Sequence, residues 1–210
     1  MARMYRVSRR MGSLTLDTLD DLPRQCRGCV FWEVAPECTG AQVRGACDDP
    51  ALDKEAWVSA TLLEWGSCGR IAYVDGMPAG FITYADPRYV PRAAEFPSGP
   101  ASADAALLMT AHVTPAYAEI GLGRLLVQAA AHDLAKRGIT ALEAFGDTRG
   151  ETGACVAPAE FFRAVGFKTV RAHPHYPRLR LDLRRLPGWG TGAGAIEHEV
   201  ERWLASVTPA

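Results

Sequence analysis

The chain has 210 residues, of which 48% are hydrophobic and 22% are charged, and its formal net charge is -1. That length supports one large domain or two small ones, with a core that needs no disulfide or metal to hold it. The near-neutral charge argues against general binding to nucleic-acid phosphates, and no apolar run reaches the roughly 20 residues that a membrane helix needs. We therefore expect a globular protein with no membrane segment and no general nucleic-acid partner.

The beginning of the chain is basic and does not continue into the apolar segment of a secretion signal. We expect residues 1–12 to form a flexible arm, with an organelle-targeting segment as the alternative, and we expect a cytoplasmic protein with reduced thiols. Apolar and polar residues then alternate over Ser13–Leu19, which predicts a short strand. The segment 26–49 is rich in Cys, Gly and Pro without periodicity, so it is predicted to be an irregular excursion.

A helix is predicted to begin at Pro50 and to end near Gly66. Asp49 is a favourable N-cap, Pro50 suits the first helical position, and acidic residues follow near the positive end of the helix dipole. Apolar residues recur at helical spacing at Leu52, Ala56, Ala60 and Leu63. This stripe predicts an amphipathic helix.

A hairpin and a long central strand come next. Arg70–Val74 and Met77–Tyr84 flank Asp75-Gly76, a dipeptide that suits the positive φ angles of a type I′ turn. Residues 86–104 contain four prolines and are predicted to be a loop. The strongly apolar run Ala105–Val113 predicts a buried central strand.

The next part of the chain alternates helices and strands. Leu122–Arg137 carries one apolar face and is followed by Gly138 as a C-terminal cap. A strand over Ile139–Phe145 would complete a strand–helix–strand crossover, and hence a parallel pair with the central strand. The remaining predicted elements are a short helix from Pro158 to Gly166 and an antiparallel pair, Lys168–Ala172 and Leu179–Leu183.

Residues 188–210 are expected to lie outside the main domain, which we place at residues 13–187. A glycine-rich linker, Gly188–Gly194, leads to a predicted amphipathic helix. Its apolar stripe is formed by Ile196, Val200, Trp203, Leu204 and Val207. The stripe packs either on its own domain or on a second subunit, so a monomer and a homodimer both stay open.

The most informative residues connect the central strand to the following helix. The strand stops before Pro115, and Gly121 and Gly123 lead the chain into the helix. Amides at a helix start have no intrahelical acceptor and the dipole adds positive charge, so a pyrophosphate can bind there. Glycine lets phosphates approach the amides, and Arg124 can add a charge-assisted contact. Tight helix–strand packing is the alternative explanation of the two glycines.

This spacing resembles the signature motif of the GNAT superfamily of acetyl-CoA-dependent N-acetyltransferases, which runs Val-x-Pro, a tyrosine two residues on, and then Arg/Gln-x-x-Gly-x-Gly/Ala. The matching residues are Val113, Pro115, Tyr117, Gly121 and Gly123. The element order over residues 13–184 and the helix ending Phe161–Phe167 are also similar to that superfamily. The resemblance implies an α/β fold with a central mixed sheet flanked by helices and a V-shaped split between the fourth and fifth main strands.

The resemblance further implies acetyl-CoA as co-substrate and an amine-bearing small molecule or peptide as acceptor. The pantetheine arm would lie between the diverging strands, and the pyrophosphate would lie on the amides of the helix start. The residues implied in cofactor binding are His112, Val113, Ala118, Glu119, Ile120, Gly121, Leu122, Gly123, Arg124, Leu125, Phe161 and Phe162.

Two positions depart from the superfamily pattern. Ala118 stands where arginine or glutamine is usual, and Phe162 stands where many members have the tyrosine that protonates the leaving thiolate. A phenyl ring cannot act as a general acid, so Cys155 and Tyr176 become candidates for that role. The candidate bases are His112, Glu143 and Glu33, with a water molecule as the alternative. Among these groups, His112, Glu143 and Tyr176 are our candidate catalytic residues.

Four of the six cysteines, Cys26, Cys29, Cys38 and Cys47, lie in the irregular excursion. They could form a structural zinc site, but the second close pair typical of zinc ribbons is missing, so we favour free reduced thiols over zinc or redox chemistry and assign no metal. In the GNAT plan this segment helps to wall the acceptor site. Phe31, Trp32 and Glu33 are therefore candidate substrate contacts, since aromatic surfaces and a carboxylate suit an amine; an aromatic core is the alternative.

The sequence thus predicts an N-acetyltransferase. The alternative is a coenzyme A-binding regulator of the same fold without turnover, with or without a structural zinc, which the residues at positions 118 and 162 suggest. A third interpretation, modification of an RNA or aminoacyl-RNA, rests on the arginines between residues 178 and 185.

Overall fold

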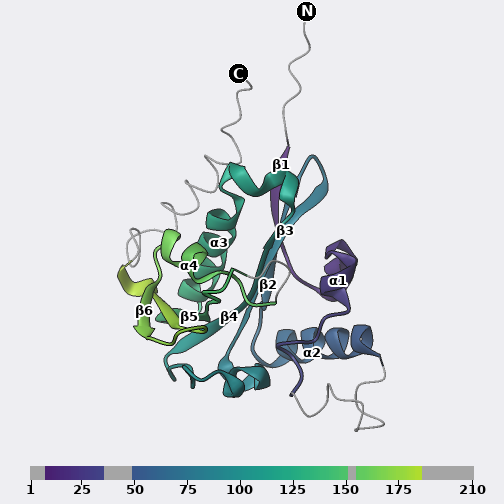
Figure 1. Ribbon diagram of the computed structural model, residues 1–210. Helices are drawn as coiled ribbons and strands as arrows, with labels where there is room; N and C mark the ends of the chain where they lie inside the picture. Colours follow the sequence, from purple (N-terminus) through teal and green to yellow (C-terminus); the bar gives the residue numbers. More distant parts are fainter. Residues whose placement is uncertain (1–7, 36–48, 151–154, 186–210) are drawn as a thin grey trace, which may run out of the picture.

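The computed structural model describes residues 8–35, 49–150 and 155–185, and its centre is a seven-stranded sheet (Figure 1). The strands are β1 (Arg9–Ser13), β2 (Gly69–Val74), β3 (Met77–Ala85), β4 (Ala105–Val113), β5 (Ala141–Phe145), β6 (Lys168–Arg171) and β7 (Arg178–Asp182). Their order across the sheet is β1-β2-β3-β4-β5-β7-β6. Every neighbouring pair is antiparallel except β4–β5, which is parallel and is connected by a helix, as the sequence predicts.

Helices cover both faces of this sheet (Figure 1). The α-helices are α1 (Arg24–Arg27), α2 (Pro50–Glu64), α3 (Leu122–Lys136) and α4 (Ala159–Ala164). Short 3-10 helices are η1 (Leu16–Asp21), η3 (Pro87–Tyr89), η4 (Pro91–Glu95), η5 (Pro115–Ile120) and η6 (Leu183–Arg185). α3 and α4 lie on one face, where Leu126 and Phe162 join the main core cluster, while α1 and α2 lie on the other, where Val58 packs with Phe81.

Local sequence signals place most of these elements correctly. Asp75 and Gly76 have φ angles of 50° and 78°, so the predicted type I′ hairpin between β2 and β3 is confirmed. β4 occupies the residues predicted for it. The Asp49 side chain accepts hydrogen bonds from the amides of Ala51 and Leu52, which confirms the N-cap of α2.

The prediction of the first strand is wrong. β1 occupies Arg9–Ser13, and most of the predicted strand Ser13–Leu19 instead forms the 3-10 helix η1. The amide of Thr15 donates to the hydroxyl of Thr18 at 2.8 Å, a local side-chain bond that competes with strand pairing. The expected flexible arm therefore overlaps β1 at residues 9–12, and residues 1–7 lie outside the described chain.

The apolar stripe predicted on α2 is not the face that packs. Leu52 is 61% exposed and Leu63 is 87% exposed. The buried residues of the helix are Lys54, Val58 and Thr61, which share the opposite face. A lysine can be buried here because Glu33, from another segment, pairs with it.

The sheet splits between β4 and β5, as the fold prediction requires. Their parallel pairing ends at Leu108–Ala144, whereas β4 continues to Val113. Against β3, Thr83 pairs with Thr110 while Tyr84 pairs with Leu108, so β4 carries one extra residue at this point. Such a bulge bends the strand, and among the described residues no strand pairs with the end of β4 on the β5 side.

Three predictions fall on residues outside the described ranges. These are the second half of the cysteine-rich excursion, the linker at residues 188–194 and the amphipathic helix after it. Within the described parts of the chain, no helix combines the length and the apolar character needed to cross a membrane.

Candidate active site

The first part of the site is the start of α3. Gly121 has φ +77°, and a Cβ added there would meet no atom within 4 Å, so open space adjoins the backbone. The amides of Arg124 and Leu125 donate to the carbonyl of Gly121 at 3.1 and 3.3 Å. The amides of Leu122 and Gly123 precede the first intrahelical bonds, so they are free to bind an anion in that space. This local geometry fits a pyrophosphate.

The two glycines of this turn have different functions. At Gly123 a Cβ would lie 2.8 Å from Cε2 of Phe161, so this glycine allows α4 to pack against α3. The packing explanation thus holds for Gly123, whereas the left-handed backbone and the open space belong to Gly121. Phe161 borders the turn, whereas Phe162 is only 1% exposed and packs in the core with Phe167.

The other residues predicted to bind the cofactor surround the turn at Gly121, and their side chains differ in exposure. The side chains of Leu122 and Leu125 are buried, and those of Ala118 and Ile120 are exposed; the side chain of Glu119 lies outside the described part. Arg124 is exposed, and its Nη2 donates to the carbonyl of Ala164 at the end of α4, at 2.7 Å. The predicted charge of Arg124 is therefore placed at the C-terminus of α4, where it also complements the helix dipole.

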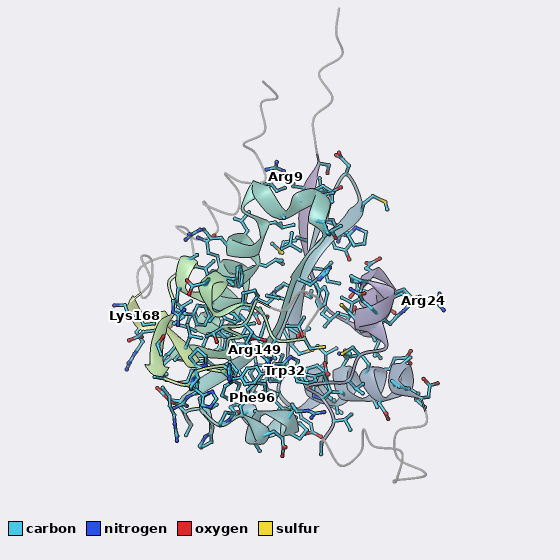
Figure 2. The ribbon with its side chains drawn as sticks, in the orientation of Figure 1. Arg9, Arg24, Trp32, Phe96, Arg149 and Lys168 are labelled. Atoms are coloured by element: carbon cyan, nitrogen blue, oxygen red, sulfur yellow. The ribbon has the colours of Figure 1, made fainter. Side chains whose placement is uncertain are left out.

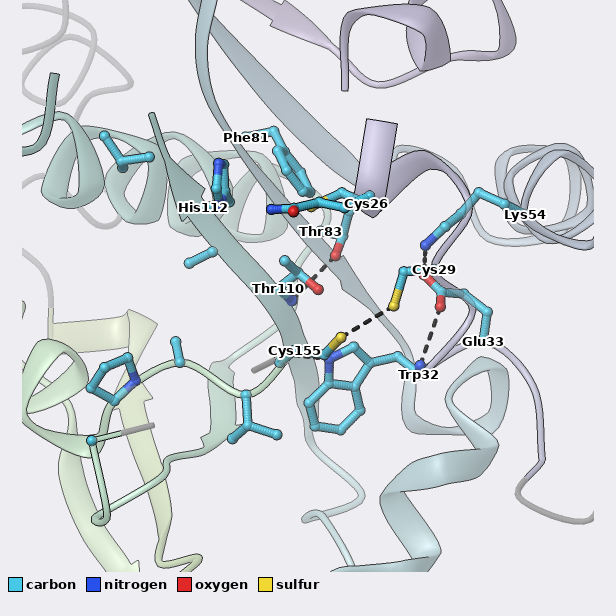
Figure 3. Close-up of a pocket in the computed structure, with 17 residues that line it drawn as sticks. Cys26, Cys29, Trp32, Glu33, Lys54, Phe81, Thr83, Thr110, His112 and Cys155 are labelled. Atoms are coloured by element: carbon cyan, nitrogen blue, oxygen red, sulfur yellow. Dashed lines mark hydrogen bonds and ion pairs between the residues drawn. The ribbon is translucent and has the colours of Figure 1, made fainter. Parts of the chain in front are cut away.

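The second part of the site is a cavity of about 430 Å³ at the split between β4 and β5. Three walls form most of its lining: the segment from α1 through residue 33, the middle of β3 with the end of β4, and residues 155–158 before α4. Lys54 of α2 and Gly150 complete it. Figure 3 shows Cys26, Cys29 and Glu33 on one wall facing Thr110 and His112 of β4. Val113 also lines the cavity, so the end of β4 connects it with the turn at Gly121.

His112 is the sequence-predicted catalytic residue that lines this cavity. It also lines a second hollow of about 440 Å³ that extends toward η1 and is bounded by Leu22 and Pro115. Burial lowers the pKa of His112, and its ring lies 5.7 Å from that of Phe81. The imidazole is therefore neutral at pH 7 and can accept a proton.

Glu143 and Tyr176 have structural surroundings instead. Glu143 is fully buried, and its carboxylate accepts bonds from the amide of Ser102 and from the guanidinium groups of Arg178 and Arg180. Tyr176 packs edge-on against Phe96 and accepts a hydrogen bond from Arg149. Neither residue lines the cavity. The structure therefore does not support either as the base or the acid, because their polar groups are already engaged.

The predicted substrate contacts separate into two lining residues and one supporting residue. Trp32 is 1% exposed and lies beside Phe96 (Figure 2), on which its ring stacks with the centroids 5.1 Å apart. It also lines the cavity. Glu33 also lines the cavity, and its carboxylate pairs with Lys54 and accepts from the amide of Trp32 at 3.2 Å. Phe31 lies behind them, edge-on to Trp32. Trp32 therefore both packs in the aromatic core, which was the alternative interpretation, and lines the cavity.

The cysteines form a different group from the predicted one. Cys26 and Cys29 lie in the wall, and the sulfur of Cys29 is 3.1 Å from that of Cys155. Cys38 and Cys47 lie outside the described residues. Within residues 8–35, 49–150 and 155–185, no three His, Cys, Asp or Glu side chains are placed to hold a metal ion, so zinc is unsupported there.

The sequence profile of the acetyltransferase (GNAT) family matches residues 31–167, about two thirds of the chain. The chain belongs to the GNAT acetyltransferase family. The split sheet and the turn at Gly121 are thus the frame of a GNAT acetyltransferase, in agreement with the resemblance noted in the sequence.

Solved structures agree with this fold. The PaiA N-acetyltransferase of Thermoplasma acidophilum, solved with coenzyme A, matches with a TM-score of 0.55 and 17% identity over 83% of this chain and 99% of that one. YncA of Salmonella typhimurium, solved with acetyl-CoA, matches with a TM-score of 0.55 and 12% identity over 85% and 96%. An N-acetyltransferase of Staphylococcus aureus matches with a TM-score of 0.54 and 13% identity, over 83% of this chain and 98% of that one. No curated protein matched the sequence.

Sequence reasoning missed several residues that line this cavity, among them Lys54, Thr83 and Thr110. Lys54 gives no readable signal, because its burial depends on Glu33, which lies in a separate segment and pairs with it. Thr83 and Thr110 give no signal either. The amide of Thr110 donates to the hydroxyl of Thr83 at 3.2 Å beside the β3–β4 bulge, and the residue types at these positions do not predict a bulge.

Proposed function

We propose that this protein transfers the acetyl group of acetyl-CoA to an amine of a small molecule or peptide. The observation that carries the proposal is the continuity of the site: the open backbone turn at Gly121 leads along the end of β4 to a cavity lined by His112, Glu33 and Trp32. A phosphate-binding turn beside an acceptor-sized cavity suits a nucleotide-linked acyl donor.

The donor would supply a thioester-activated acetyl group when bound. The amides at the start of α3 would bind its pyrophosphate, and the unpaired edge of β4 beyond Leu108 would offer backbone groups to the arm that follows. The cavity would hold the acceptor amine close to the acyl carbon, so that proximity and orientation lower the barrier. The contacts with the donor would thus come mainly from backbone, which explains why few charged side chains are needed for it.

A nitrogen atom of the His112 imidazole would take the proton that the amine loses. Its lowered pKa keeps it neutral at pH 7, and its place between two hollows lets it meet an acceptor that enters from either one. The Glu33 carboxylate would help to hold a cationic amine before transfer, even though Lys54 balances part of its charge.

A second candidate function is supported by Phe162. In the superfamily pattern the position of this buried phenyl ring holds the tyrosine that protonates the departing thiolate, and a phenyl ring cannot supply a proton. A coenzyme A-binding regulator without turnover would tolerate this residue.

Product formation separates the two functions. The full chain is incubated with acetyl-CoA and a panel of amines, and acetylated products are identified by mass spectrometry while binding of acetyl-CoA is followed by calorimetry. Binding with acetylation of at least one amine class is the expected result. Binding without any product over a broad panel would favour the regulator, and absence of binding would exclude both.

A further inference from the structure

The cavity wall joins two cysteines from distant segments of the chain. Cys29 follows α1 and Cys155 precedes α4, 126 residues later, yet their sulfur atoms are 3.1 Å apart (Figure 3). The S–S bond of a disulfide is about 2.05 Å long. Formation of that bond would therefore need the sulfurs to approach by only about 1 Å.

Both cysteines are held in this position by their neighbours. The carbonyl of Cys155 accepts a hydrogen bond from Nε1 of Trp32 at 3.0 Å, which docks the two segments on each other. Trp32 is in turn fixed by stacking on Phe96 and Phe145. The amide of Phe31 donates to the sulfur of Cys29. These contacts of the folded chain therefore hold the two thiols next to each other.

The two thiols differ in protonation. The hydrogen bond from the Cys155 thiol lowers the pKa of Cys29 to about 6, and the same bond raises the pKa of Cys155. A cysteine whose pKa is lowered by a hydrogen bond from a neighbouring thiol has the arrangement of a reactive cysteine. Cys68 provides the contrast, because it is fully buried and burial raises its pKa to about 12.

We propose that Cys29 and Cys155 form a reversible disulfide that controls the acceptor cavity; the control, unlike the bond itself, rests on the proposed function. With hydrogen peroxide as oxidant, the Cys29 sulfur attacks one oxygen, the O–O bond breaks and hydroxide leaves, which gives a sulfenic acid. The Cys155 sulfur then attacks the Cys29 sulfur, the S–S bond forms and water is released. The two cysteines lose two electrons, and the peroxide gains them.

This bond would act on the acceptor and not on the cofactor turn. Cys29 and Cys155 line the same cavity as His112 and Glu33, so closing the bond would move the wall of that cavity. Gly121 lies beyond the end of β4, outside the lining of this cavity. Oxidation is therefore expected to change transfer to the amine while the affinity for acetyl-CoA stays the same.

The bond is tested directly on the full chain. Protein treated with hydrogen peroxide is alkylated, digested without reductant and mapped by mass spectrometry. We expect a peptide pair that links Cys29 to Cys155, is lost after dithiothreitol, is absent from Cys29→Ser and Cys155→Ser, and persists in the matched control Cys68→Ser. A link from Cys29 to Cys26, Cys38 or Cys47, or free Cys29 and Cys155 after oxidation, would overturn the proposal.

The control is tested on the same samples with an amine that the reduced protein acetylates. We expect kcat/KM for the amine to fall by about tenfold or more on oxidation and to return with dithiothreitol, because small displacements in a site cost large factors in rate. Cys155→Ser should show no such response. Equal kcat/KM in the two states, with the link present, would overturn the control. Calorimetry with acetyl-CoA on the reduced protein tests the proposed function separately.

Discussion

The turn at Gly121 and the wall around Cys29 lie at the two ends of one site, and they are built in opposite ways. The turn is made by one contiguous stretch of backbone, in which the left-handed Gly121 and the start of α3 leave amides free. The wall is made by side chains of three segments, and Trp32, Glu33 and Cys155 meet there only in the folded chain.

This difference separates what is general in the site from what is individual. Backbone amides recognise a phosphate by geometry alone, so the turn suits any member of the family that uses the same cofactor. Side chains determine which acceptor fits, and here they include a buried ion pair and two close thiols. We expect changes in the wall to affect stability and acceptor use, and changes in the turn to affect cofactor affinity.

The largest expected effect comes from Trp32→Ala. This side chain is buried, stacks on Phe96 and binds the Cys155 carbonyl, so its loss leaves a cavity and an unpaired carbonyl. The free energy of unfolding should fall by about 3–5 kcal/mol in chemical denaturation. The matched control is Leu63→Ala on the exposed face of α2, which should change it by less than about 0.5 kcal/mol. Similar losses of unfolding free energy in both variants would contradict the assignment of Trp32 as a buried residue and of Leu63 as an exposed one.

The ion pair in the wall predicts the next effect. Lys54→Met leaves the buried carboxylate of Glu33 without its cation and should lower the free energy of unfolding by about 3 kcal/mol. The double variant Glu33→Gln/Lys54→Met removes both charges and keeps an acceptor for the Trp32 amide, so it should recover much of that loss. If the double variant were as unstable as the sum of both single variants, the two side chains would not be coupled.

His112→Gln tests the residue that lies between the turn at Gly121 and the wall around Cys29. We expect kcat to fall by about 100-fold, while the KM for acetyl-CoA stays close to that of the unaltered protein. Because burial lowers the pKa of His112 and the neutral form is the base, kcat/KM should rise with pH and reach half of its plateau below pH 6.5. His175→Gln, at an exposed loop position, is the matched control. If kcat/KM of His112→Gln fell at low pH as it does in the unaltered protein, the group that titrates would be another one.

Much of the fold could be predicted because its signals are local. The dipeptide Asp75-Gly76 fixes a hairpin, and the apolar face of α3 with Gly138 after it fixes a helix and its end. The face of α2 could not be read in this way. Its apolar stripe and its buried face compete, and the burial of Lys54 depends on Glu33 in a segment that periodicity does not include.

The candidate site divides along the same line. Gly121 could be identified because the two glycines between a strand and a helix lie in one contiguous stretch whose spacing resembles the GNAT motif. The sequence could not indicate that Glu143 is held between Arg178 and Arg180, or that Cys155 lies beside Cys29, because cross-strand register and a contact across 126 residues arise only from the tertiary fold.

Calorimetry of acetyl-CoA binding to Gly121→Ala and Gly138→Ala tests the central claim most directly. Both glycines belong to the ends of α3, both have φ +77°, and neither has an atom within 4 Å of an added Cβ, so the two changes impose the same backbone strain. We predict that Gly121→Ala weakens binding by about tenfold, or 1.4 kcal/mol, while Gly138→Ala binds like the unaltered protein. Equal affinities for the two variants would contradict the assignment of the turn at Gly121 as the phosphate site.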